Sequence, residues 1–259
     1  MYVLIYSAVI LIATFCGAFV GLGGGVIIKP ALDAINIDSI DTVNFISCCA
    51  VFAMSISSSL KQITAKTKYD LKYLLLVSCG SLIGGVPGSH AFNTLLEKFG
   101  NNSMKSIQGI ILGTVLVLAV IYINLKNPPS LNTKNPVCLF LSGLFLGALA
   151  SFLGVGGGPI NVAFLMFLSG LDIKSSTVYS IGIVFFSQLS KLITLFVTSS
   201  IPAVKTSVIA VAVISAVSGG IIGATLNKKC SNKPIKTVFT VVVTAVALLN
   251  FYNAFIFLK

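Results

Sequence analysis

The chain has 259 residues, of which 56% are hydrophobic and only 9% are charged. Soluble domains carry about 25% charged residues, so this composition excludes a soluble protein and predicts an all-α integral membrane protein. The net charge of +11 comes entirely from lysines, most of which lie in short connections between apolar runs. Such loop charge is typical of a protein oriented in a lipid bilayer, and it argues against a nucleic-acid-binding surface.

Eight apolar segments follow one another along the chain. They cover residues 3–35, 43–60, 71–96, 107–125, 137–168, 178–197, 204–226 and 238–258. The first twenty residues have no basic start and run directly into a glycine cluster, so we interpret them as a retained span and not as a signal peptide. The linker "LKNPPSLNTKNP" (residues 125–136) contains three prolines, which stop helices. It predicts two transmembrane repeats, residues 1–130 and 131–259.

The two halves resemble each other. An offset of 133 residues superposes the cluster at residues 21–25 ("GLGGG") on residues 154–158 ("GVGGG") without a gap, and it also pairs Ser47 with Ser180. At an offset of 135, residues Gly80, Gly84 and Gly88 fall on Ser215, Gly219 and Gly223. Small residues four apart let two helix backbones approach closely. These matches predict a duplicated four-segment protein.

Lysine placement bears on how the two repeats are oriented. If all eight segments cross the membrane, the loop lysines divide almost evenly between the two sides. If segments 1 and 5 enter, turn at their glycines and leave on the same side, eleven loop lysines lie on one side and four on the other. The positive-inside rule favours the second arrangement. It predicts three crossings per half, inverted repeats and both termini outside.

The glycine clusters interrupt segments 1 and 5, and each is followed by a short apolar piece that is too short to cross a bilayer. A helix that starts inside the membrane leaves backbone N–H groups unpaired and carries partial positive charge, so it favours an anion. The alternative is that the glycines only permit tight packing. The candidate substrate-binding residues here are Gly23, Gly24, Gly25, Gly156, Gly157, Gly158, Pro159 and Asn161.

The polar residues of the spans also favour an anion. All six acids fall near segment ends, whereas a cation pathway usually shows an acid at mid-span. Segment 6 carries Ser180, Gln188 and Lys191, and Ser47 is the first-half counterpart of Ser180. Lys191 is either a counter-charge for the substrate or a side chain that snorkels to the interface.

The sequence shows no cofactor or metal motif. The six cysteines form no CxxC pair, and His90 is the only histidine. We therefore expect no catalytic residues, no metal and no cofactor, with the lipid bilayer and a small anion as partners. The oligomeric state is left open.

The paired G-x-G-G-G signature resembles that of the TauE/SafE sulfite exporter-like family, also called the TSUP permeases. The closest stretch is "GVGGGPINVAFL" followed by "SSTVYS" at residues 175–180. Val26 departs from the pattern because the second copy has Pro159 there, and Gln188 stands where asparagine is expected. The resemblance implies a multi-pass plasma-membrane transporter, not an enzyme, that moves small sulfur-containing anions such as sulfite or organosulfonates.

Three functions remain open at this point. The leading expectation is a secondary carrier that works by alternating access, because duplicated halves with broken helices suit that mechanism. The alternatives are a membrane-embedded redox protein or enzyme, and an anion channel. The transport direction and the coupling ion are not predicted.

Overall fold

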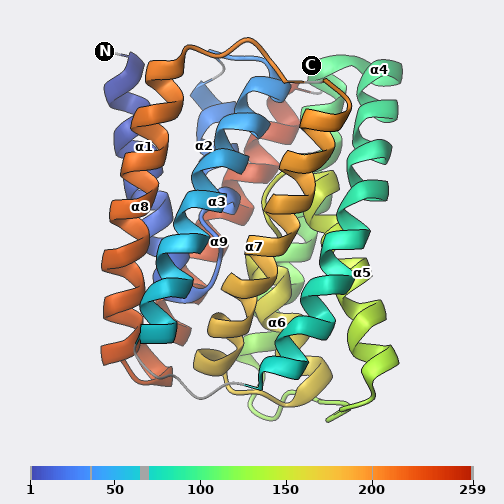
Figure 1. Ribbon diagram of the computed structural model, residues 1–259, viewed down its shortest axis with the longest axis vertical. Coiled ribbons are helices and arrows are strands. Elements are labelled where there is room, and N and C mark those ends of the chain that lie inside the picture. The colour runs from blue at the N-terminus through green and yellow to red at the C-terminus, as the bar shows by residue number, and fades with distance from the viewer. Residues whose placement is uncertain (1, 36, 65–69, 200, 258–259) are drawn as a thin grey trace.

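The computed structural model describes residues 2–35, 37–64, 70–199 and 201–257, and this part of the chain is helical with no strands (Figure 1). The helices are α1 (Tyr2–Val20), α2 (Gly25–Ile35), α3 (Ile40–Thr64), α4 (Leu71–Asn124), α5 (Pro136–Leu153), α6 (Gly158–Ser169), α7 (Ile173–Val197), α8 (Thr206–Lys229) and α9 (Asn232–Phe257). The predicted all-α class is confirmed.

Helices α1 and α2 form a hairpin that enters and leaves on one face. The chain reverses between them at Gly21, Gly23 and Gly24, which have φ of 77°, 78° and 72°. Only glycine adopts such left-handed angles at little cost, which explains why the first apolar run contains this cluster. The Tyr6 hydroxyl donates to the Asp38 carboxylate, so the two ends of the hairpin lie together.

Helices α5 and α6 form a second hairpin that enters from the opposite face (Figure 1). Gly154, Gly156 and Gly157 reverse the chain with φ between 71° and 75°. Its two ends also meet, because the N–H of Leu131 donates to the carbonyl of Phe167 over 2.8 Å. Both glycine clusters are therefore turns between two antiparallel helices.

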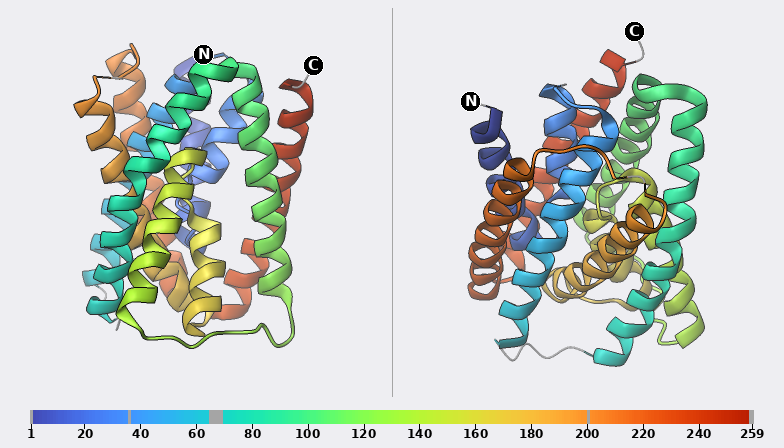
Figure 2. Two further views of the ribbon diagram at one scale, coloured as in Figure 1. Left: turned by 90° about the vertical axis from the view of Figure 1, so that its right-hand side faces the viewer. Right: turned by 45° about the horizontal axis from the view of Figure 1, so that its top comes forward.

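The other helices run from one face to the other. Helix α4 does this twice, because its chain reverses at Gly100 (φ 76°, ψ 175°). The sequence predicts two segments joined by a connection from about residue 97 to 106. The two helical stretches are present, but the predicted length of the connection is wrong, because the backbone is helical on both sides of Gly100. The described ends of α1 and α9 lie on the same face, together with the α4 reversal (Figure 2).

Rows of small residues hold each hairpin to a crossing helix. Gly84 and Gly88 of α4 lie against the backbone of Leu144 and Ala148 in α5. In the same way, Gly219 lies against Leu11 of α1, and a Cβ added at Gly219 would stand 2.7 Å from the Leu11 carbonyl oxygen. The α4–α5 contact and the α1–α8 contact thus use the two rows of small residues that the offset of 135 superposes. The division into two repeats at residue 130 stays a prediction.

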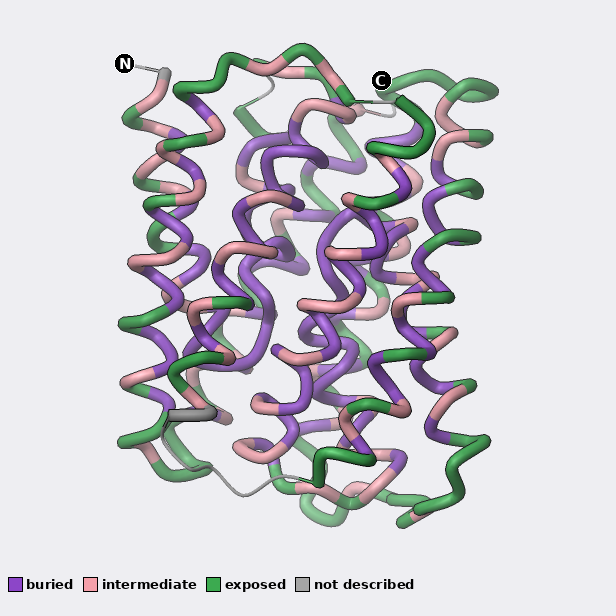
Figure 3. Tube along the Cα trace, viewed as in Figure 1, coloured by how far each residue is buried: buried purple, intermediate pink, exposed green. Residues whose placement is uncertain are grey.

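The surface of the bundle suits a lipid environment. Seven of the described helices are long and apolar enough to cross a membrane, and α1 and α5 are among them. Large apolar side chains are exposed on the outside, such as Leu118, Ile214 and Phe255, while the buried backbone gathers in the centre (Figure 3). The protein is a multi-pass membrane protein. The C-terminal ends of α3 and α8 lie on the face opposite the termini (Figures 1 and 2), and their last turns contain Lys61 and Lys229. Lys66 and Lys68 lie outside the described residues.

Candidate substrate site

The tips of the two hairpins touch in the middle of the bundle. The carbonyl of Leu22 lies against the α-carbon of Gly158, and a Cβ added at Gly25 would stand 2.6 Å from the carbonyl oxygen of Val155. Gly23 faces Val184, which lies near the middle of α7. Each glycine turn therefore shapes the space around the other.

Around the first turn the polar groups bond to one another. The Ser180 hydroxyl lies 2.7 Å from the carbonyl oxygen of Gly21 and 3.2 Å from that of Gly158. Asn227 Nδ2 donates to the carbonyl oxygen of Phe19 over 2.6 Å and to Thr177 Oγ1 over 3.3 Å. Ser180, a predicted substrate residue, thus joins the two turns through their carbonyls.

Around the second turn several buried polar groups have no partner among the described residues, although Gln108 Nε2 donates to the carbonyl oxygen of Phe152 over 2.5 Å. Among the described residues, no hydrogen bond is made by Lys191 Nζ, Gln188 Nε2, Ser47 Oγ or either side-chain polar atom of Asn44 and Asn161. All five residues are at least 96% buried. Buried polar groups in native proteins are nearly always paired, so a group of unpaired polar side chains is typical of a binding site for a polar ligand.

Several of these polar side chains lie beside the glycines of the second turn. A Cβ built on Gly154 would stand 3.4 Å from Lys191 Nζ, and one on Gly156 would stand 3.1 Å from Gln188 Nε2. One on Gly157 would stand 3.2 Å from the amide oxygen of Asn161, and Asn44 of α3 also lies against Gly154. Because glycine has no side chain, the backbone, two donors of α7 and the amides of Asn44 and Asn161 come close to the same space.

The start of α6 adds to the positive character of this region. The helix begins at Gly158 with Pro159 in its first turn, and its N-cap residue, Gly157, has no side chain that could cap the helix start. The first N–H groups of a helix have no intrahelical partner and carry the positive end of its dipole. Helix α2 begins at Gly25 in the other hairpin. A small anion is the ligand that these features suit.

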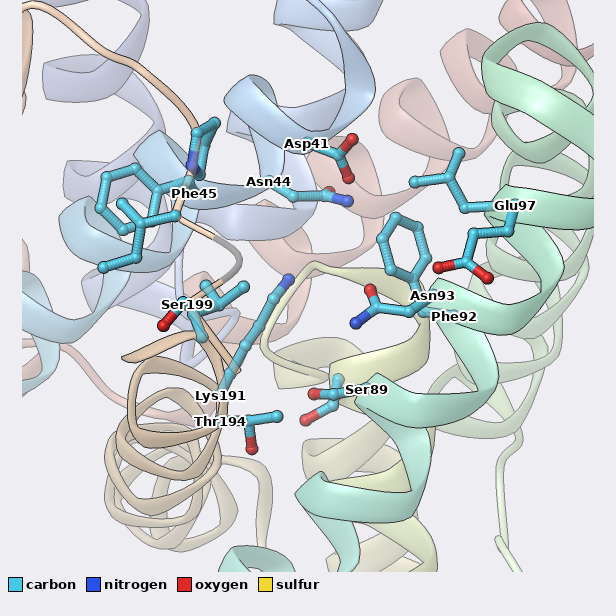
Figure 4. A pocket seen from close by; sticks show the side chains of 15 residues that line it. Asp41, Asn44, Phe45, Ser89, Phe92, Asn93, Glu97, Lys191, Thr194 and Ser199 are labelled. Atoms are coloured by element: carbon cyan, nitrogen blue, oxygen red, sulfur yellow. The ribbon is translucent and has the colours of Figure 1, made fainter. Parts of the chain in front are cut away.

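A cavity of about 340 Å³ lies beside the second turn, towards the face of the termini. Lys191 and Asn44 line it together with Ser151, which belongs to the turn-side end of α5. Figure 4 shows the Lys191 side chain directed into the cavity towards Asn44. The other lining residues are Asp41, Phe45, Ser89, Phe92, Asn93, Leu96, Glu97, Thr194, Leu195, Ser199, Ile201 and Pro202.

The structure brings together only part of the predicted set. Gly156, Gly157, Asn161, Gln188 and Lys191 lie around the second turn. Gly23 and Gly24 belong to the first turn, whose polar neighbours are already bonded, and Gly25 begins α2. Lys191 is 4% exposed, so its side chain does not reach the surface.

Sequence reasoning missed several polar residues of the site. Asn44, Ser89 and Ser151 are buried in the cavity wall without partners in the described part of the chain. A signal for Asn44 was present, because the offset of 133 pairs it with Thr177, beside the Ser47–Ser180 pair. No comparable sequence signal marks Ser89 or Ser151.

One acid near a segment end is buried. Asp33 lies two residues before the end of α2, as the sequence predicts, yet it is only 6% exposed, because α2 packs between α1, α3 and α9. Its carboxylate pairs with Lys29 Nζ over 3.0 Å and lies 3.9 Å from Lys105 Nζ. Position along a segment is a poor guide to burial when that segment folds into a hairpin.

A family model described as sulfite exporter TauE/SafE matches residues 6–249, which include both glycine turns and every residue that lines the cavity. The chain belongs to the sulfite exporter TauE/SafE family. A search of the curated proteins finds no match. Membership in the TauE/SafE family implies a membrane exporter or permease for sulfite or related sulfur compounds.

Proposed function

We propose that this TauE/SafE protein is a secondary carrier of small sulfur-containing oxyanions, such as sulfite or small organosulfonates, in the plasma membrane. The observation that carries the proposal is the Lys191 ammonium beside the amide of Asn44 and the amide nitrogen of Gln188, none of which has a hydrogen-bond partner in the described part of the chain. An oxyanion that leaves water needs donors to replace its hydration, and a buried ammonium without a partner is costly by itself. The oxyanion needs donors and the ammonium needs a negative partner, so each satisfies the other.

The difference between the two faces supports alternating access over a channel. The cavity lies on the side of the termini. On the other side, Lys174 Nζ donates to the carbonyl oxygens of Lys228 (3.1 Å) and Cys230 (2.8 Å), and Asn227 bonds to Phe19 and Thr177. The offset of 133 pairs Lys174 with Asp41 of the cavity wall. Asp41 thus lines an open cavity on one side, whereas its counterpart Lys174 is bonded on the other side, as in a carrier with inverted halves.

Exchange in proteoliposomes tests the proposal. Liposomes loaded with unlabelled sulfite or ethanesulfonate should take up the same labelled anion by counterflow, and sulfate and thiosulfate serve as competitors. Lys191→Gln should weaken apparent affinity at least about tenfold, since it removes a charged donor. Lys205→Gln is the matched control, because Lys205 is exposed in the loop before α8. No exchange of any of these anions, or a conductive flux without counter-substrate, would overturn the proposal.

A further inference from the structure

The cavity contains a buried cation and a carboxylate that the proposed site does not use. Lys191 contributes the cation from α7, and Asp41 lines the same cavity from the first turn of α3 (Figure 4). Asp41 is half-buried, whereas Glu97, the other carboxylate of the wall, is exposed near the reversal of α4. The inner part of the cavity therefore holds one positive and one negative charge.

The neighbouring charges do not alter this balance. Asp41 lies in the electrostatic field of Lys191 and of Lys29 from α2. Lys29, however, is paired with Asp33 on its own helix over 3.0 Å. The charged and titratable groups around Asp41 are Lys191 of α7, Lys29 and Asp33 of α2, Glu97 of α4, Cys48 and Cys49 of α3, and Asp38, which accepts from Tyr6 of α1.

Binding of an anion disturbs the balance in one direction. Without substrate, the ammonium of Lys191 and the carboxylate of Asp41 compensate each other across the cavity. A monoanion that binds at Lys191 leaves one uncompensated negative charge in a cavity whose inner wall is made of buried side chains, which is unfavourable. A proton on the carboxylate of Asp41 restores neutrality. Anion binding and proton binding are then linked, and each strengthens the other.

We propose that Asp41 is a proton-binding site and that one proton crosses with each monoanion. The proton comes from water on the side to which the cavity opens, converts the carboxylate to a carboxyl group, and leaves to water on the other side after the anion. The inference rests on the proposed anion carrier. A proton suits the site better than a metal cation, because a single carboxylate next to an ammonium attracts a metal ion poorly.

The two halves differ at this position, which assigns the role to one residue. The counterpart of Asp41 is Lys174, whose ammonium is bonded to carbonyl oxygens at the end of α8. A proton-binding carboxylate at this position is therefore a property of α3 alone.

A transport experiment with a probe of fixed charge tests the inference. Proteoliposomes are given labelled ethanesulfonate, whose charge does not change near neutral pH, and the membrane potential is clamped with potassium and valinomycin. With a more acidic outer solution, the unmodified protein should accumulate the probe above equilibrium, about tenfold for each pH unit at one proton per anion. Asp41→Asn should abolish this accumulation yet keep counterflow exchange, which also reports that the variant is folded.

Two further variants sharpen the result. Asp41→Glu keeps a titratable group and should keep accumulation. Asp172→Asn is the matched control, since it changes an exposed carboxylate just before α7, and should accumulate the probe normally.

The failures can be told apart. Three results would overturn this inference and leave the proposed carrier intact, provided that the unmodified protein shows counterflow. They are normal accumulation in Asp41→Asn, accumulation driven by a sodium gradient, and loss of accumulation in Glu97→Gln alone. Absence of counterflow in the unmodified protein would overturn the proposed function and this inference with it.

Discussion

The carbonyl of Leu22 lies against the α-carbon of Gly158, so the two glycine turns meet through backbone and not through side chains. Leu22 is fully buried. Ser180 reinforces the contact, because its hydroxyl lies within hydrogen-bond distance of a carbonyl oxygen in each turn. The two hairpins are therefore in direct backbone contact at the site where the unpaired polar groups gather.

Gly158→Ala should destabilise the protein. The added Cβ would meet the Leu22 backbone, which cannot move away as a side chain can. Overpacking of this kind costs about 1–3 kcal/mol, which lowers Tm by about 2–12 °C in a protein of this size. Thermal unfolding of the detergent-purified variant measures it. Gly182→Ala is the control, since its Cβ would meet only the end of the flexible Leu74 side chain, 2.7 Å away. Equal Tm values for the two variants would contradict the tight contact between the turns.

Gln188→Leu should weaken substrate affinity without loss of stability. Gln188 is 1% exposed, and its Nε2 has no hydrogen-bond partner among the described residues, so its removal breaks no internal bond at that atom. A hydrogen bond to a charged ligand contributes about 1.5–3 kcal/mol, which corresponds to about a ten- to hundredfold change in apparent affinity. Counterflow at varied anion concentration and a thermal melt measure the two effects. Ser187→Ala is the control, because its hydroxyl donates within α7 to Val184. An unchanged affinity in Gln188→Leu would remove this side chain from the site.

Asn227→Ala should loosen the face opposite the termini. Its Nδ2 holds the end of α1 at Phe19 and the start of α7 at Thr177. Loss of the two bonds costs about 1–2 kcal/mol, a factor of about 5 to 30 in the opening equilibrium. Amide hydrogen exchange of a peptide over residues 174–180 should accelerate by this factor. Asn124→Ala, which removes bonds to Val120 and Thr240 at an exposed site, should leave that peptide unchanged. Equal exchange in both variants would mean that Asn227 does not hold this face closed.

The lysine distribution predicts how the protein sits in the membrane. The reversal of α4 lies on the face of the termini, and the connection between α8 and α9 lies on the lysine-rich face (Figures 1 and 2). Asn102 follows the reversal by two residues, and Ser231 belongs to the α8–α9 connection. In a background without native cysteines, a cysteine at Asn102 should react with an impermeant thiol reagent from outside intact cells. A cysteine at Ser231 should react only after the cells are opened. The opposite pattern would invert the orientation, and reaction of both from the same side would contradict the fold.

The helical class and the two breaks were predictable because they depend on strong local signals. Runs of apolar residues longer than a bilayer requires define the spans, and glycines at residues 21–25 and 154–158 are the residues that accept left-handed backbone. The α4 reversal was less well predicted. A single residue, Gly100, turns the chain, and the polar residues from Glu97 to Lys105 resemble a loop although they lie in helix.

The composition of the site was harder to predict, because it depends on how distant elements meet. Asn44 and Ser151 become site residues only when α3 and the end of α5 face the same cavity, and nothing in their local sequence records that contact. The same holds for Ser180 and Gln188, which lie on one helix. The first donates to the turns and the second has its amide nitrogen unpaired, because the turns touch α7 at different heights.

The central claim is that an oxyanion binds at Lys191 beside the second glycine turn, and anomalous X-ray scattering tests it most directly. Selenite has the shape and charge of sulfite and contains one strong anomalous scatterer. In crystals soaked at concentrations that compete for exchange, the selenium peak should lie within hydrogen-bond reach of Lys191 Nζ, between Asn44 and Gln188, and should vanish in Lys191→Gln crystals. A peak at Lys29 and Lys105 instead, or one at Lys191 that persists in the variant, would contradict the account.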